Sequence, residues 1–230
     1  FQHYHARLLH LDQHPQELEI FLQQLKSTRL GLRFEMFIWF WLLDQNYHPY
    51  ELLGHSIQKI AGPKTLGELD FLLLNTETNK IEHWEVALKY YLAERDFSLA
   101  YWYGLNRSDT LIRKLNHFSQ KQFQFEEALD HQIDQRFAIL KGQLYLPVEH
   151  TQQVIPAWVN LKRRLGYWGS HVPPQNAHFY RLQRQEWICP ASHLSSETAH
   201  WWGNGLYLQK DKSNFYMYRN APLLSQRVNA

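Results

Sequence analysis

Apolar and polar positions follow two helical patterns and then a strand pattern in the first third of the chain. Residues 15–26, PQELEIFLQQLK, begin with proline, carry acids in the first turn and repeat apolar side chains at helical spacing. Residues 29–44, RLGLRFEMFIWFWLLD, are apolar nearly all round, which predicts a buried helix. Residues 50–61, YELLGHSIQKIA, predict a strand that ends at a turn over Gly62 and Pro63.

Three further elements follow before the pattern changes. Residues 66–75 and 80–90 predict the two strands of a hairpin, because the segment that joins them, NTETN, is a polar turn. Residues 107–123 predict an amphipathic helix, with Ser108 or Asp109 as its cap.

After about residue 135 the segments become short, aromatic and strand-like, separated by Gly, Pro, Asn and His. We therefore predict an α/β half followed by a β-rich half. The expected boundaries are residues 1–130 for the core with its N-terminal helices and residues 131–230 for the β-rich portion. No flexible linker separates the two, so we expect the second to pack on the first.

Asp70 and Glu85 are acids inside the two apolar strands of the predicted hairpin. If these strands pair through the polar turn, both carboxylates lie near one another at one edge of the sheet. Two ionised carboxylates close together repel, and burial raises that cost. A divalent cation such as Mg²⁺ removes the problem, because it accepts carboxylate ligands. The spacing leaves an alternative open, in which the acids point to solvent or pair with Lys89 and Arg33.

Glu35 is a third acid, and it lies inside the apolar helix. An unpaired carboxylate there is costly, so it needs a partner. Arg33 is two residues away on a helix and does not face it, which favours a metal site or Lys89. The other interpretation is that this face of the helix is exposed and Glu35 is solvated.

In this order, these residues resemble the core of the PD-(D/E)xK, or restriction-endonuclease-like, nuclease superfamily. Gly67-Glu68-Leu69-Asp70 matches the G-E-(I/L)-D strand of that superfamily, Glu85 matches the acid of its E-x-K strand, and Glu35 matches its helix acid. The wider wording, TLGELDFLL, HWEVALKYYL and GLNRSDTLIRKL, resembles an uncharacterised bacterial family assigned to the superfamily. The resemblance implies a mixed central sheet flanked by helices, followed here by the β-rich, aromatic C-terminal extension.

The resemblance also implies hydrolysis of phosphodiester bonds in DNA with Mg²⁺ or Mn²⁺. Asp70 and Glu85 would hold the ion together with the carbonyl of Val86, and Glu35 would bind a second ion or a metal-bound water. Lys89 would orient that water or help to deprotonate it.

One position departs from the family motif. Ala87 stands where E-x-K has its lysine, and Lys89 lies two residues later on the same face. Its Cα is therefore about 6.6 Å further along the strand, a distance that a flexible lysine stem can span. The departure leaves open whether Lys89 only pairs with an acid and catalysis is lost.

Basic and amide side chains elsewhere are candidates for substrate contacts. Lys114 and Gln120, on the predicted helix, are the residues we expect to bind phosphate, as related nucleases imply; each one also fits a solvated helix face. Arg163 and Arg164 precede Tyr167 and Trp168, a combination that fits contacts to backbone phosphate and bases. Inward-facing aromatics of a β-rich half give the same pattern.

The composition is that of a globular protein, but it does not identify a binding partner. Hydrophobic residues make up 44% and charged residues 20% of the chain, as in globular proteins, and a net charge of +2 permits nucleic-acid binding without requiring it. The single cysteine excludes an internal disulfide and a cysteine-based zinc site, and it fits the cytoplasm. The longest apolar run, residues 36–43, is too short to span a bilayer, so we expect no membrane partner.

Three hypotheses result. The first is a Mg²⁺-dependent deoxyribonuclease. The second is a catalytically inactive nuclease-fold protein that binds nucleic acid or a protein partner. The third is a structural interaction module that uses its aromatic C-terminal half.

Overall fold

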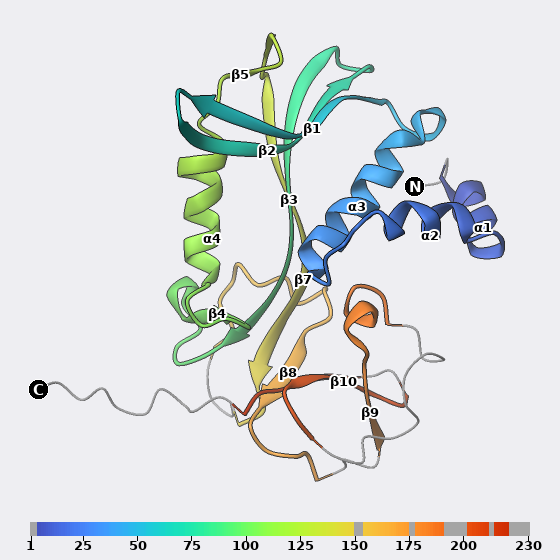
Figure 1. Cartoon of the computed structure of the whole chain (residues 1–230). Coiled ribbons are helices and arrows are strands. Elements are labelled where there is room, and N and C mark those ends of the chain that lie inside the picture. The colour runs from blue at the N-terminus through green and yellow to red at the C-terminus, as the bar shows by residue number, and fades with distance from the viewer. Residues whose placement is uncertain (1–3, 150–153, 175–177, 191–201, 212–213, 221–230) are drawn as a thin grey trace, which may run out of the picture. The chain divides into compact units, whose positions relative to one another are not determined.

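A β-sheet with helices beside it is the framework of the computed structural model, which describes residues 4–149, 154–174, 178–190, 202–211 and 214–220 (Figure 1). The described α-helices are α1 (His5–Gln13), α2 (Gln16–Gln23), α3 (Leu30–Leu43) and α4 (Leu111–His117). The described strands are β1 (Tyr50–Ala61), β2 (Lys64–Asn75), β3 (Lys80–Ala93), β4 (Trp102–Gly104), β5 (Glu127–Ala128), β6 (His131–Gln132), β7 (Gln135–Pro147), β8 (Gly166–Gly169), β9 (Phe179–Arg181), β10 (Gly205–Gln209) and β11 (Phe215–Tyr218).

The large sheet is mixed. Its strand order is β1-β2-β3-β7-β8-β11-β10-β9, with β4 paired to β3, and β5 and β6 form a separate pair. Parallel pairs join β7 to β8 and β8 to β11, whereas β1, β2 and β3 are antiparallel to one another. The predicted α/β class is confirmed.

The chain divides into two compact units, and each unit draws on segments that are distant in the sequence. The first comprises Phe1–Lys89 and Lys114–Lys141, and the second comprises Tyr90–Arg113 and Gly142–Ala230. Strands β3 and β7 contribute residues to both units. The division into residues 1–130 and 131–230 remains a prediction about folding domains, which compactness alone does not test.

The predicted hairpin forms in the first unit. Strands β2 and β3 pair antiparallel from Phe71 opposite Trp84 to Asn75 opposite Lys80. The Asn75 side chain builds the turn, because its Oδ1 accepts hydrogen bonds from the backbone N–H groups of Glu77, at 3.1 Å, and Thr78, at 3.3 Å. β2 begins two residues earlier than predicted and β3 ends three residues later.

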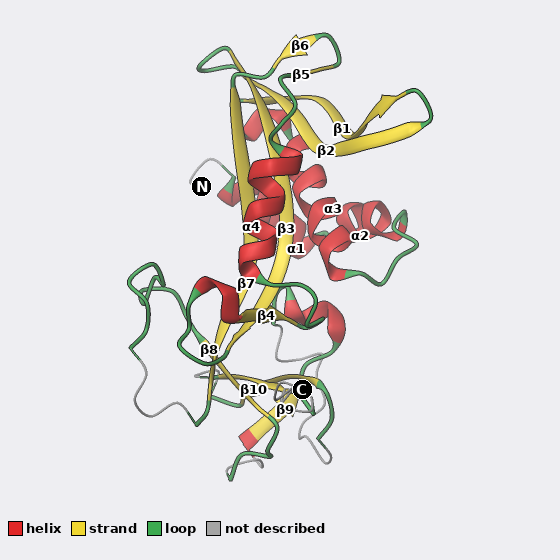
Figure 2. Ribbon diagram, turned by 90° about the vertical axis from the view of Figure 1, so that its left-hand side faces the viewer, coloured by secondary structure: helices red, strands yellow, loops and turns green. Residues whose placement is uncertain are grey.

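Opposite faces of β3 are covered by different helical segments. The Trp84 ring stacks on Trp41 of α3, with centroids 6.3 Å apart, whereas the His83 ring meets Phe123, which follows α4, edge to face at 5.7 Å. Neighbouring residues of a strand point to opposite faces, so α3 and the segment after α4 lie on opposite sides of the sheet (Figures 1 and 2). Buried Leu69 and Leu72 of β2 pack in the core of this unit with Phe125, Ala128 and Ile133.

The predicted helix over 107–123 is shorter and less regular than expected. α4 covers only Leu111–His117, and a π-helical turn, Phe118–Gln122, continues it. The predicted caps are wrong, because the side chain of Thr110 accepts the N–H of Arg113, at 3.3 Å. α3 is also less buried than expected, since Leu43 is 51% exposed. None of the helices in the described ranges is long and apolar enough to cross a membrane.

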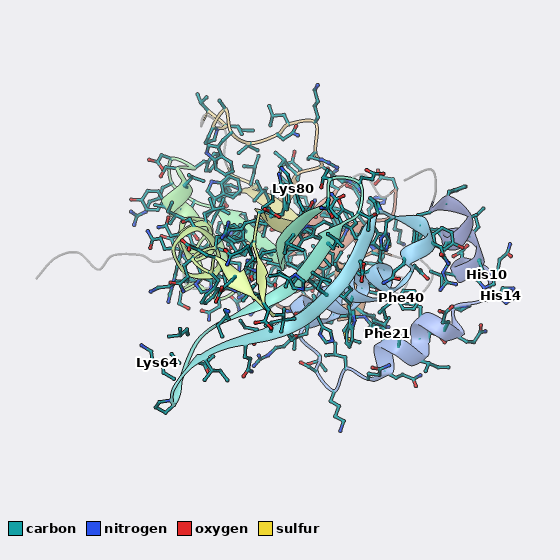
Figure 3. All side chains as sticks on the ribbon, turned by 90° about the horizontal axis from the view of Figure 1, so that it is seen from above. His10, His14, Phe21, Phe40, Lys64 and Lys80 are labelled. Carbon is teal, nitrogen blue, oxygen red and sulfur yellow. The ribbon has the colours of Figure 1, made fainter. Side chains whose placement is uncertain are left out.

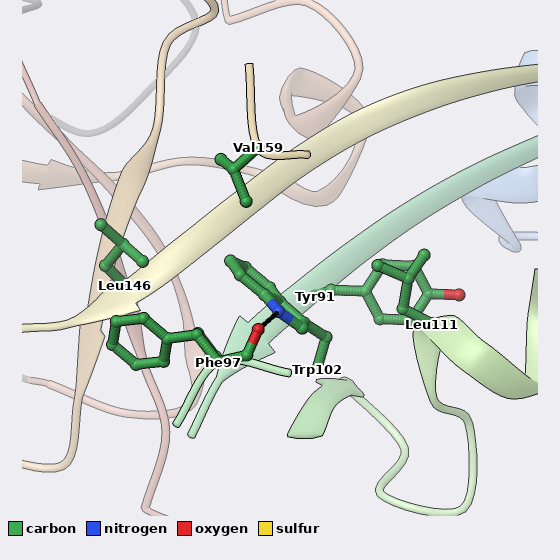
Figure 4. Close-up of a cluster of buried hydrophobic side chains, with 7 residues drawn as sticks. Tyr91, Phe97, Trp102, Leu111, Leu146 and Val159 are labelled. Carbon is green, nitrogen blue, oxygen red and sulfur yellow. Dashed lines mark hydrogen bonds between the residues drawn. The ribbon is translucent and has the colours of Figure 1, made fainter. Parts of the chain in front are cut away.

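In the second unit, apolar side chains gather around Trp102 (Figure 4). This side chain is fully buried, and its Nε1–H donates to the carbonyl of Phe97 at 2.8 Å. The cluster comprises Tyr91, Ala93, Phe97, Trp102, Leu111, Leu146 and Val159. A second cluster contains the rings of Phe179, Tyr207 and Tyr216.

Candidate active site

Asp70 and Glu85 meet where the main-chain ladder between β2 and β3 ends. The last backbone-paired residues are Phe71 and Trp84. One residue further on, carboxylate side chains accept hydrogen bonds from the backbone of the opposite strand. Asp70 Oδ2 accepts the backbone N–H of Val86 at 2.7 Å, and Glu85 Oε1 accepts the backbone N–H of Asp70 at 3.4 Å. The two acids are therefore neighbours across the strands, as the alternation predicts.

Glu85 is buried, with 1% of its surface exposed, and both of its oxygens accept hydrogen bonds. His83 Nε2 lies 2.7 Å from Oε1, and Gln122 Nε2 donates to Oε2 at 2.6 Å. An ionised carboxylate only accepts, so the bond to His83 requires the proton on Nε2. His83 is fully buried, and its Nδ1 has no hydrogen-bond partner. The orientation of the Glu85 carboxylate is thus fixed from two sides.

The pKa of the Asp70 carboxyl is strongly raised in this site. Burial, and after it the negative charge of Glu85, raise the pKa of Asp70 to about 7, and Glu35 adds to the effect. The hydrogen bond from Val86 and the positive charge of Lys114 act in the opposite direction and only partly compensate. The site therefore calls for a proton or a cation near pH 7.

Glu35, the third predicted acid, belongs to the same group of charges. Burial in α3 raises its pKa, reinforced by Glu68 and Glu85, while a hydrogen bond with the Ser56 side chain lowers it. The partner that the sequence left open is thus a hydroxyl of β1.

Ser56 lies in β1 opposite Asp70, between the pairs His55–Phe71 and Ile57–Leu69. Its φ is 49°, in the left-handed region that non-glycine residues rarely adopt. Such strain concentrates at functional sites and breaks the simple alternation of a strand. The sequence holds no signal for it.

Positive side chains lie beside the acids. His117, at the end of α4, has its pKa lowered by burial and then by the charges of Lys114, Lys121 and Lys89, while Glu85 raises it. The Lys114 ammonium also lies 3.9 Å from the centre of the Phe118 ring. Of the predicted cations, Lys114 therefore acts on Asp70 directly, whereas Lys89 acts on His117.

The amide that reaches the acids is Gln122, whereas Gln120 is exposed. Besides its bond to Glu85, Gln122 Nε2 lies 3.3 Å from the Glu68 carbonyl. The π-helical turn shifts the direction of the side chains relative to a regular α-helix, and such turns are frequent at functional sites. The motif glycine, Gly67, packs against the segment that follows this turn. Any larger residue would be too close, because a Cβ at position 67 would lie 2.9 Å from the Phe125 ring.

Arg163 and Arg164 belong to the second unit. The backbone N–H of Arg163 donates to the Asn160 carbonyl at 3.0 Å, and the Arg164 guanidinium lies 4.8 Å from the centre of the Phe215 ring. The predicted role of these arginines in phosphate binding stays a prediction.

The ligand atoms are of the kind that a hard cation prefers, but they are not arranged as a complete metal site. Asp70, Glu85 and Glu35 offer carboxylate oxygens, the ligands that Mg²⁺ prefers. Across the part of the chain that the structure describes, however, no group of three or more His, Cys, Asp and Glu side chains is arranged to hold a metal ion.

Comparison with known proteins places the chain in a family. A family model with the description "Domain of unknown function (DUF1853)" matches residues 1–215. No curated protein and no solved structure matches the chain significantly. The chain therefore belongs to the DUF1853 family.

Proposed function

We propose that this chain is a cytoplasmic, metal-dependent nuclease with a restriction-endonuclease-like core, and that it hydrolyses phosphodiester bonds in DNA. The observation that carries the proposal is that three carboxylates, from a helix and two strands, act on one another: burial, and after it the charges of Glu85 and Glu35, raise the pKa of Asp70 to about 7. Acids brought together in this way need a neutralising partner. The order of the three elements matches the nuclease motif, which makes Mg²⁺ or Mn²⁺ the partner proposed.

A bound divalent cation would polarise a phosphoryl oxygen and lower the pKa of a coordinated water. Asp70 and Glu85 would hold that cation, with the Val86 carbonyl as a further oxygen and Glu35 beside a metal-bound water. Each carboxylate oxygen has two lone pairs, so Glu85 can keep its bonds to His83 and Gln122 and still offer a ligand.

Cations of the chain would act on the phosphate. Lys114 lies close enough to Asp70 to lower its pKa, and Lys89 lies close enough to His117 to do the same there. Either ammonium would stabilise the negative charge that develops on the phosphoryl oxygens. Lys89 would replace the motif lysine, whose position Ala87 occupies.

A second function, nucleic-acid or protein binding without catalysis, is favoured by one observation. Both oxygens of Glu85 are already satisfied by protein donors, so the fold needs no cation at this carboxylate. Together with Ala87 in the motif position, this fits a nuclease fold that has no hydrolytic activity.

Calorimetric titration with Mg²⁺ and Mn²⁺, together with cleavage assays on single-stranded and duplex DNA and RNA, distinguishes the two. The nuclease proposal expects metal binding and cleavage that are both lost in Asp70→Asn. The matched control is Asp134→Asn, because Asp134 is an exposed acid of the same unit that also accepts a strand N–H, that of Ile81, at 2.8 Å. Absence of metal binding and of cleavage in the wild type would refute the nuclease proposal and leave the binding function.

A further inference from the structure

The β1–β2 hairpin continues past the core of the first unit as a two-stranded ribbon. We define the hairpin arm as residues 58–66; its ladder pairs include Ile60 with Thr65 and Ala61 with Lys64. Every residue of the arm is exposed except Lys59, which is half-exposed. Figure 3 shows Lys64 at the far end of this ribbon.

The turn at the tip is built for a tight hairpin. Gly62 has a φ of 58°, as the first central residue of a type II′ turn requires, and Pro63 follows it. The base of the arm is anchored, because Ile57 packs on the core of the first unit and Gly67 lies against Phe125. The arm is thus a regular β-hairpin that projects from the first unit, and not an irregular loop.

Burial does not account for the arm. A two-stranded hairpin alone is marginally stable in water, and here its apolar side chains stay in solvent, with Ile60 62% and Leu66 48% exposed. A ribbon that covers nothing in its own unit has both faces available for a partner.

Charge indicates the class of partner. Between Glu51 and Glu68 the chain contains Lys59 and Lys64 and no acidic residue. Glu68 pairs with Gln58 at the base of the arm, and from Lys59 to Gly67 the ribbon carries two lysines and no acid. This exposed stretch complements a polyanion.

We propose that the hairpin arm binds the backbone of double-stranded DNA and holds it for the candidate active site. The inference rests on the proposed function for the identity of the polyanion. The major groove of B-DNA, about 12 Å wide, admits a two-stranded β-ribbon. Lys59 and Lys64 bind phosphates on its rim, while Ile60 and Leu66 contact the apolar parts of bases and sugars.

The arm and the acids are joined by one continuous strand. β2 runs from Lys64 at the tip to Asp70, six residues further on, which corresponds to about 20 Å. At about 3.4 Å per base pair, the phosphates bound by the arm lie about six base pairs from the phosphodiester at the acids. The arm therefore sets where along a duplex the site acts.

The test measures binding of a fluorescein-labelled 24-base-pair DNA duplex by polarisation, in EDTA and at several salt concentrations. The variant is Lys59→Gln/Lys64→Gln, and the matched control is Lys26→Gln/Lys80→Gln, which removes the same charge from exposed positions outside the arm. Two lost phosphate contacts lower the slope of log K against log salt by about 1.8 and weaken binding about tenfold or more at low salt. The control changes neither quantity to that extent.

Equal binding by both double variants would overturn the inference. So would loss of binding to phosphatidylglycerol vesicles with unchanged duplex binding, because the arm would then serve a membrane surface. Thermal unfolding of each variant verifies that the exposed substitutions leave the fold intact.

The failure of this inference is separable from that of the proposed function. EDTA prevents metal-dependent cleavage, so duplex binding of the wild type and of the lysine variants reports on the arm alone. If binding depends on the arm but no cleavage occurs, the proposed hydrolysis is refuted and DNA binding by the arm is supported. If cleavage occurs but binding does not depend on the arm, hydrolysis is supported and DNA binding by the arm is refuted.

Discussion

Replacing Asp70 by Asn removes one charge from the acid cluster at almost constant shape. The amide oxygen of Asn can still accept the Val86 N–H that Asp70 accepts at 2.7 Å. The negative charge that repels Glu85 is gone. In the absence of metal, we therefore expect Asp70→Asn to be more stable than the wild type at alkaline pH.

The magnitude follows from the pKa of Asp70, which is about 7 in the folded protein against an ordinary value of 3.8. The folded state binds the proton more tightly, so the stabilisation it provides is complete below pH 3.8 and is lost as the pH rises through about 7. About three pH units correspond to about 4 kcal/mol as an upper limit. Because Asp70 is only partly buried and water screens its charge, we expect Asp70→Asn to gain about 1–3 kcal/mol at pH 8.

Urea unfolding in EDTA from pH 5 to pH 8 measures this gain directly. The difference between Asp70→Asn and the wild type should be smallest at pH 5 and grow up to pH 8. Adding Mg²⁺ should raise the free energy of unfolding of the wild type only, because a ligand stabilises the state that binds it. Asp134→Asn serves as the control, since Asp134 is exposed and also accepts a strand N–H.

A wild type that stays as stable as Asp70→Asn at pH 8 in EDTA would refute the reasoning. It would mean that burial and the charge of Glu85 do not disfavour the ionised form of Asp70. A difference that shrinks as the pH rises would contradict the sign of the linkage.

Three further substitutions test the supports of the site and the core. Gln122→Ala removes the donor to Glu85 Oε2 and leaves a buried oxygen unsatisfied, which should cost about 1–3 kcal/mol in urea unfolding. Ser56→Gly and Ser56→Ala both lose the hydroxyl that bonds to Glu35, but only Ser56→Gly relieves the φ of 49°, so Ser56→Ala should be less stable than Ser56→Gly by about 1 kcal/mol or more. Trp102→Ala empties a fully buried site and removes one donor to the Phe97 carbonyl, so calorimetry should show a loss of about 3–5 kcal/mol in the free energy of unfolding.

The hairpin and the position of its acids are predictable because they depend on local rules. A period of two places Asp70 and Glu85 on defined faces, and Asn75 supplies the turn that sets the register of β2 against β3. The acids then follow from the strand pairing without any tertiary information.

The supports of the acids depend on geometry that no local rule contains. Gln122 replaces Gln120 because a π-helical turn follows α4, and helical spacing assumes a regular α-helix. Ser56 reaches Glu35 through a left-handed φ, which a serine in a strand pattern does not suggest. His83 shares the face of Glu85 by alternation, but only the fold shows that it is fully buried there.

Stability alone does not explain why Asp70 is an acid. An amide at this position keeps the bond to Val86 and avoids repulsion from Glu85, and an uncharged site is often more stable than a buried charged one. A proton neutralises Asp70 below about pH 7, so the fold can exist without a cation. Above about pH 7 Asp70 is ionised, and its negative charge destabilises the folded state unless a cationic ligand binds to it. The acid at position 70 is thus not required by the fold, and this is the reason for proposing that it binds a cation.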